Sequence, residues 1–67
     1  MKLHVIIEQD EDGYYVATVP ALRSCYTQAD NLDDLHLRLK EVIDLCLEEE
    51  TPQPIKFVSV EEIEVAA

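Results

Sequence analysis

The stretch DEDGYYVATVPALRSCYTQAD, residues 10–30, contains most of the signals that decide the fold. Its acidic turn ends in Gly13, the only glycine of the chain, and glycine accepts the positive φ of tight hairpin turns. The run Tyr14 to Val19 is aromatic and β-branched, which favours a strand. Pro20 has no amide hydrogen and ends that strand. A short extended piece from Cys25 to Gln28 follows, so we expect strands on both sides of the proline.

The residues around this stretch predict one more strand and a helix. Lys2 to Gln9 alternates apolar and polar side chains, and together with the turn it forms a hairpin. Asn31 is a typical N-cap, and the acidic residues after it suit the positive end of a helix dipole. The sequence TPQP, residues 51–54, ends the helix. The expected buried stripe of the helix follows i, i+3, i+4, i+7 spacing and consists of Leu32, Leu35, Leu39, Val42, Ile43 and Cys46, with Leu47 at its edge.

The last apolar stretch, IKFVSVEEIEVAA, residues 55–67, alternates in part and predicts a fourth strand, with a bulge near Glu61. The order is then β-β-β-α-β in a single α+β domain over residues 1–67, with a mixed four-stranded sheet and the helix on one of its faces. The fourth strand joins beside the first or the third; the pattern leaves this open. The uncovered face would present apolar side chains typical of an interface, drawn from Ile6, Tyr14, Val16 and Tyr26.

Charge and size restrict the class of partner. The chain has 67 residues, with 15 Asp and Glu against 5 Lys and Arg, a formal net charge of −10. Such a surface repels phosphate backbones, so we expect no direct nucleic acid binding and favour a basic protein partner. A domain this small is marginally stable, which favours oligomerisation. The first residues, MKLHVIIEQDEDG, lack the long apolar run of a signal or membrane span, and we expect a cytoplasmic protein with no membrane partner.

The sequence gives no signal for catalysis, a metal or another cofactor. Cys25 and Cys46 have no zinc-site spacing; we interpret both as small buried apolar residues, with one Cys25–Cys46 disulfide as the alternative. His4 and His36 belong to no catalytic pattern. The acidic turn lacks the later ligands of a calcium loop and is expected to face water. We therefore predict that the protein is not an enzyme.

Glu48, Glu49 and Glu50 oppose the dipole at the carboxyl end of the helix. They are either a solvated, fraying helix end or part of an acidic surface for a cationic partner. Leu37 and Leu45 lie opposite the buried stripe, as two surface leucines or as a second contact surface. For the oligomer we expect the exposed sheet face and the edge of the fourth strand. The predicted partner-binding residues, with two tyrosines as aromatic anchors, are Glu8, Asp10, Glu11, Asp12, Tyr14, Tyr26, Glu48, Glu49 and Glu50.

The stretch DEDGYYVATVPALRSCYTQADNLDDLHLRLKEVIDLCLEE resembles the amino-terminal domain of the HicB family of antitoxins. That family has an acidic residue, Gly and Tyr or Trp entering a strand, then Pro-x-Leu-x-Gly-Cys, then Ser/Thr-x-Gly-Asp-Thr-Leu-Glu-Glu-Ala at the start of the helix. Two glycines of this pattern are replaced, by Ser24 and Ala29. We expect relaxed backbone geometry around the third strand. The matching residues are Asp12, Gly13, Tyr14, Pro20, Leu22, Cys25, Thr27, Gln28, Asp30 and Leu32.

The resemblance implies a partial ribonuclease H-like fold with sheet order 3-2-1-4 and no activity of its own. It also implies a partner, the basic toxin HicA, which cleaves messenger RNA and which HicB binds and silences. The carboxyl-terminal DNA-binding domain of many HicB proteins has no counterpart in these 67 residues, so we expect no operator binding from this chain.

Three functions follow from these observations. We expect a HicB-like antitoxin that occludes the active site or RNA-binding surface of a HicA-type toxin. The alternative is a solitary HicB-like homo-oligomeric adaptor or scaffold with no toxin partner. A metal-dependent nuclease is a distant third, because no set of converging carboxylates can be assigned.

Overall fold

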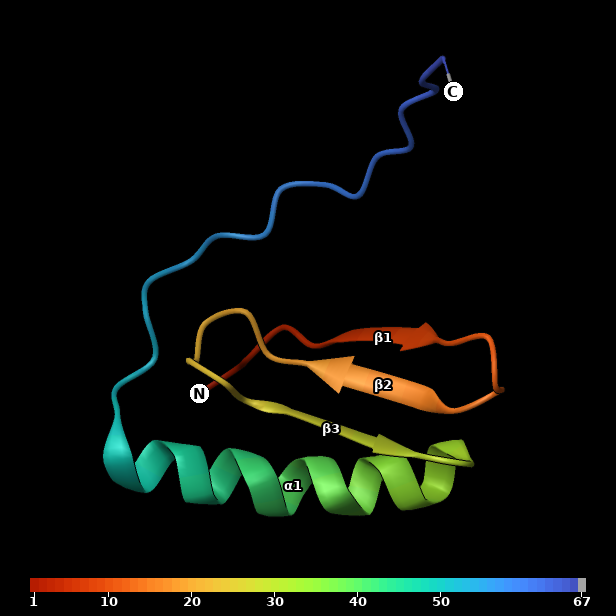
Figure 1. The fold of residues 1–67 in the computed structure, drawn as a ribbon. Coiled ribbons are helices and arrows are strands. Elements are labelled where there is room, and N and C mark those ends of the chain that lie inside the picture. Colours follow the sequence, from red (N-terminus) through yellow and green to blue (C-terminus); the bar gives the residue numbers. More distant parts are fainter. Residues whose placement is uncertain (67) are drawn as a thin grey trace.

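The computed structural model describes residues 1–66 and contains three strands followed by one helix (Figure 1). The strands are β1 (Ile6–Gln9), β2 (Tyr15–Thr18) and β3 (Tyr26–Ala29), and the helix is α1 (Leu32–Glu49). They form one antiparallel sheet in the order β1-β2-β3, with α1 packed on one face. The expected small α+β domain and its first four elements are confirmed.

The hairpin turn and the helix start form as the residue types predict. Gly13 has a φ of 90°, and its amide donates to the carbonyl of Asp10 at 3.1 Å. Asn31 has extended backbone geometry, and its side-chain oxygen accepts a 2.8 Å hydrogen bond from the amide of Asp34. These are the roles of a turn glycine and of an N-cap.

Pairing register assigns the two faces of the sheet. Ala17 pairs with Ile7 and with Thr27, and these three side chains point to the face that α1 covers. The core lies between that face and α1 and consists of Ala17, Val19, Leu22, Cys25, Ala29, Leu35 and Leu39. The helix contacts β3 and β2, whereas among the described residues it makes no comparable contact with β1. All four residues of β1 are consequently exposed.

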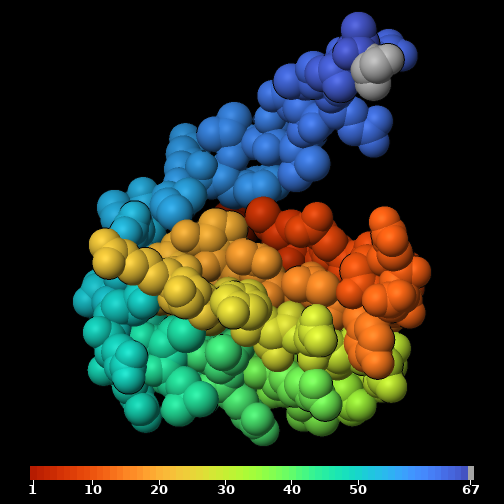
Figure 2. All heavy atoms as spheres, in the orientation of Figure 1, coloured from red at the N-terminus to blue at the C-terminus, as the bar shows by residue number. Residues whose placement is uncertain are grey.

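Over residues 1–66 the structure shows a three-stranded sheet, without the predicted fourth strand and without the expected ribonuclease H-like order 3-2-1-4. Residues 51–66, which we name the C-terminal arm, contain no helix or strand; Ala67 lies outside the described residues. The arm leaves the helix end, passes on the β1 side of the sheet and then projects away from the domain (Figures 1 and 2). Its start is held by a 2.8 Å hydrogen bond from the amide of Gln53 to the carbonyl of Ala21.

The composition of the arm explains why alternation alone did not make a strand. From Ile55 onward its odd-numbered positions are apolar except at Ser59 and Glu61, and this interruption weakens the apolar face that would fix a register on the chain's own sheet. Pro52 and Pro54 keep the chain extended and provide no amide donors.

At Ser24, just before the third strand, the backbone does not relax as expected, whereas Ala29 has no positive φ. Ser24 has a φ of 51° and is the only non-glycine residue with positive φ among the described residues. The structure thus retains a left-handed conformation with serine where the HicB pattern has glycine, at a cost of about 1–2 kcal/mol for a residue with a Cβ atom.

Candidate protein-binding surface

Most of the predicted partner-binding residues lie at two opposite ends of the domain rather than on one surface, whereas Glu8 and Tyr26 lie within the sheet. Asp10, Glu11 and Asp12 occupy the β1–β2 turn, which in Figure 1 lies at the end of the sheet next to the start of α1. The run Glu48–Glu50 lies at the far end of the helix. A single small partner site would therefore use one of these groups and not both.

Antiparallel pairing brings further carboxylates close to the β1–β2 turn. The register aligns Gln9 with Tyr15 and Tyr15 with Ala29, so Asp10 and Asp30 leave the sheet at the same end. The first turn of α1 follows directly with Asp33 and Asp34. We name this group the acidic end; it consists of Asp10, Glu11, Asp12, Asp30, Asp33 and Asp34, all exposed.

From residue types alone, we assigned Asp33 and Asp34 to the helix dipole and did not include Asp30 among the candidate partner-binding residues. The order of the antiparallel strands could have predicted that these three aspartates lie beside the turn. In two consecutive antiparallel connections, the first turn and the end of the third strand lie at the same edge of the sheet.

Several carboxylates of the acidic end also hold the backbone. One Asp10 side-chain oxygen accepts hydrogen bonds from the amides of Asp12, at 3.0 Å, and Tyr14, at 2.9 Å. The amide nitrogen of the Asn31 side chain donates to Asp30 at 2.9 Å and to Asp34 at 3.0 Å. Asp10 is thus a structural residue of the turn rather than only a solvated charge. Glu11, Asp12 and Asp33 are not among the carboxylates that hold the turn and the cap.

The face of the sheet opposite α1 carries a mixture of apolar and polar side chains. Pairing places Ile6, Thr18 and Tyr26 in one row across the three strands, and a second row follows two positions along. We name these two rows the open face; it consists of Ile6, Glu8, Val16, Thr18, Tyr26 and Gln28. Tyr26 is 64% exposed and is its largest aromatic side chain. Tyr14, just before β2, is 44% exposed at the acidic end.

At the far end of α1 the three glutamates have different surroundings. Glu48 and Glu49 are exposed, whereas Glu50 is half-buried, and its carboxylate accepts a 2.7 Å hydrogen bond from the amide of Arg23. The last turn of the helix has no basic residue. Glu50 therefore joins α1 to the β2–β3 connection, and only its two neighbours suit a cationic partner.

Two cysteines lie in or beside the core, and both histidines lie at the surface. Cys25 is buried and Cys46 half-buried, and both thiols are free. Burial, contact with Cys46 and the Glu50 charge raise the pKa of Cys25 from 9.0 to about 11. A thiol in this state is a weak nucleophile at neutral pH. His4 and His36 are both exposed, and residues 1–66 include no group of three His, Cys, Asp or Glu side chains placed to hold a metal ion.

The chain is similar over nearly its whole length to UPF0150 proteins. It is 48% identical to the one from Archaeoglobus fulgidus over 97% of this chain and 96% of the relative. It is 42% identical to the Synechocystis protein over 96% of this chain and 94% of the relative, and 34% identical to the Helicobacter pylori protein over 88% and 81%. No model of a known protein family matches the sequence. Over residues 1–66, no helix has the length and apolar character that a membrane crossing requires. By its similarity to these relatives, the chain belongs to the UPF0150 family.

Proposed function

We propose that this chain is a HicB-like antitoxin that binds a basic HicA-type toxin and covers its active site or RNA-binding surface. The motif likeness of residues 10–49 motivates the proposal, and the net charge of −10 supports it. The single structural observation that carries it furthest is the acidic end, where six exposed carboxylates gather beside the open face.

Inhibition in this proposal is steric and electrostatic. A ribonuclease needs a cationic surface to hold the RNA backbone, and an acidic protein surface competes for those same cations. Tyr14 provides exposed aromatic contact area at the acidic end, and Tyr26 provides more on the open face. Such residues are common at the centres of interfaces. No covalent step is required.

The binding test uses a basic HicA-type toxin and measures its affinity for this chain by calorimetry at several salt concentrations. Because the interaction joins opposite charges, affinity falls as salt rises. Absence of binding even at low salt would contradict the proposal. RNA cleavage by the toxin, measured with and without the chain, then shows whether binding is inhibitory.

Two matched charge variants show which end binds. Glu11→Gln/Asp12→Asn removes two carboxylates of the acidic end and spares Asp10, which holds the turn. Glu48→Gln/Glu49→Gln removes the same charge from the far end of α1. The acidic-end variant should weaken binding by about tenfold and the other should change it little, since charges at an interface matter most where they face the partner. Equal effects would mean that only net charge matters.

The second candidate is a homo-oligomeric adaptor with no toxin partner. The observation that favours it is the exposed apolar arm, because contiguous exposed apolar surface usually marks an interface. The two candidates respond oppositely to salt: binding to a basic toxin weakens, whereas association of two acidic copies strengthens.

A further inference from the structure

We propose that the C-terminal arm adds as a fourth strand to the free edge of β1 in a second copy of the chain, so that two copies exchange arms. The inference rests on the arm and on β1, and it is independent of the proposed antitoxin function.

The first step is the state of β1. Within residues 1–66 it is an edge strand that pairs with β2 alone, so one side of its backbone has no partner in the described sheet. The helix does not reach it, and Ile6 and Ile7 are about 40% exposed on opposite faces. An edge that is both unpaired and apolar is a ready template for another strand.

The second step is the state of the arm. Residues 55–65 contain no helix or strand and include six large apolar side chains, of which Val58, Val60, Ile63 and Val65 are each at least 75% exposed. Five of these eleven residues are β-branched, and such residues favour strands. Leaving so much apolar surface in water costs free energy that strand addition would recover.

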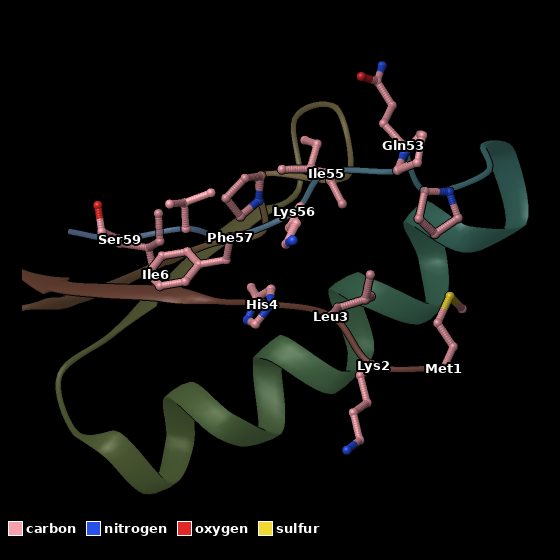
Figure 3. Close-up of a pocket in the computed structure, with 15 residues that line it drawn as sticks. Met1, Lys2, Leu3, His4, Ile6, Gln53, Ile55, Lys56, Phe57 and Ser59 are labelled. Atoms are coloured by element: carbon pink, nitrogen blue, oxygen red, sulfur yellow. The ribbon is translucent and has the colours of Figure 1, made fainter.

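The third step is the placement of the arm relative to its own β1. The ring of Phe57 lies 5.2 Å from that of His4, which keeps the first part of the arm near the N-terminal segment. A pocket of about 500 Å³ lies between the arm and the N-terminal segment (Figure 3). It is lined by residues of the N-terminal segment, the Pro20–Ala21 turn and arm residues 52–59. The last part of the arm lies away from the domain (Figures 1 and 2). The arm thus leaves its own β1 edge unpaired, and its last part is accessible to another chain.

A second copy is the occupant that satisfies both features at once. Each chain offers its β1 edge and one arm, so a twofold exchange pairs both β1 edges and covers both arms. The stiff Pro-Gln-Pro segment, residues 52–54, holds the arm extended and lowers the entropy lost on pairing. The two copies have like charge, so apolar contact rather than charge must drive the association.

The test is sedimentation equilibrium of the full chain over a range of protein and salt concentrations. We expect a dimer whose affinity rises with salt. Val58→Gln/Val60→Gln in the arm should weaken it by about tenfold or more. The matched control Leu37→Gln/Leu45→Gln removes two exposed leucines from α1 and should leave it unchanged. The arm residues lie outside the core, and circular dichroism checks that each variant is folded.

A sample mixed from isotope-labelled and unlabelled chains then locates the contact without any substitution. Nuclear Overhauser effects between the arm of one copy and β1 of the other support the exchange. A protein that stays monomeric at all concentrations overturns it, as does a dimer held by α1. Arm-to-β1 contacts found only within one chain also overturn it. A dimer that binds no toxin would leave this inference intact while contradicting the proposed function.

Discussion

The carboxylate of Glu50 accepts a 2.7 Å hydrogen bond from the backbone amide of Arg23, a residue 27 positions earlier in the chain. The amide of Glu50 in turn donates to the carbonyl of Cys46 at the end of α1. This one residue therefore ends the helix and fastens it to the β2–β3 connection. It explains the position of one acidic side chain at a helix end where negative charge is otherwise unfavourable.

Substituting Glu50 should separate its acceptor role from its charge. Glu50→Ala loses the hydrogen bond and should lower the free energy of unfolding by about 1 kcal/mol. Glu50→Gln keeps an acceptor oxygen and should retain most of that stability. Urea denaturation measures both, with Glu49→Ala as the exposed control. If the alanine variants at 49 and 50 unfold alike, the hydrogen bond to Arg23 has no stabilising role.

The Cys25 thiol predicts a loss of stability at alkaline pH. Its pKa is about 11 in the folded chain against 9.0 ordinarily, chiefly because the residue is buried. Between these values the unfolded chain has lost the proton that the folded chain still holds. Stability therefore falls as pH rises through this window, by at most about 1.4 kcal/mol per pH unit from this group.

The measurement is the free energy of unfolding from pH 8 to 11 for the wild type and for Cys25→Ala. The variant should be less stable at pH 8 but should show a shallower decline, because the titrating thiol is absent. Identical slopes would show that other groups cause the alkaline loss. A thiol reagent at pH 8 provides a second reading, since Cys25 should react slowly until the chain unfolds.

Local signals were sufficient to predict the three strands and the helix. Gly13, Pro20 and Asn31 each act through their own backbone or through near neighbours, so their roles can be predicted from the sequence. The same holds for the buried positions Leu35 and Leu39, which follow from helical spacing.

Long-range relationships were not predictable in the same way. Whether the arm pairs with β1 depends on the balance between its interrupted apolar face and competing partners, which no local pattern encodes. Likewise, Glu50 resembled its neighbours Glu48 and Glu49 in sequence, and only the approach of the β2–β3 connection distinguishes it. The acidic end could be recognised only from the pairing register, which places the first turn and the start of α1 at the same end of the sheet.

The turn carboxylate of Asp10 should be more important for stability than its acidic neighbours. Asp10→Ala removes the acceptor for the amides of Asp12 and Tyr14 and should cost about 1–2 kcal/mol. Asp10→Asn keeps an acceptor and should cost less. Glu11→Ala is the control, because it removes the same charge from the same turn and should change stability by less than about 0.5 kcal/mol. Thermal unfolding that ranks Glu11→Ala with Asp10→Ala would refute this assignment.

The left-handed conformation of Ser24 predicts a stabilising substitution. At a φ of 51°, serine pays about 1–2 kcal/mol that glycine avoids, while glycine gains about 0.4–1 kcal/mol of entropy in the unfolded chain. Ser24→Gly should therefore raise the free energy of unfolding by up to about 1 kcal/mol. Ser59→Gly is the matched control in the arm, where φ is not positive, and it should give no gain. If Ser24→Gly lowers stability in denaturant melts, serine at this position is not strained, and the left-handed turn before β3 must be held by contacts of the serine side chain instead.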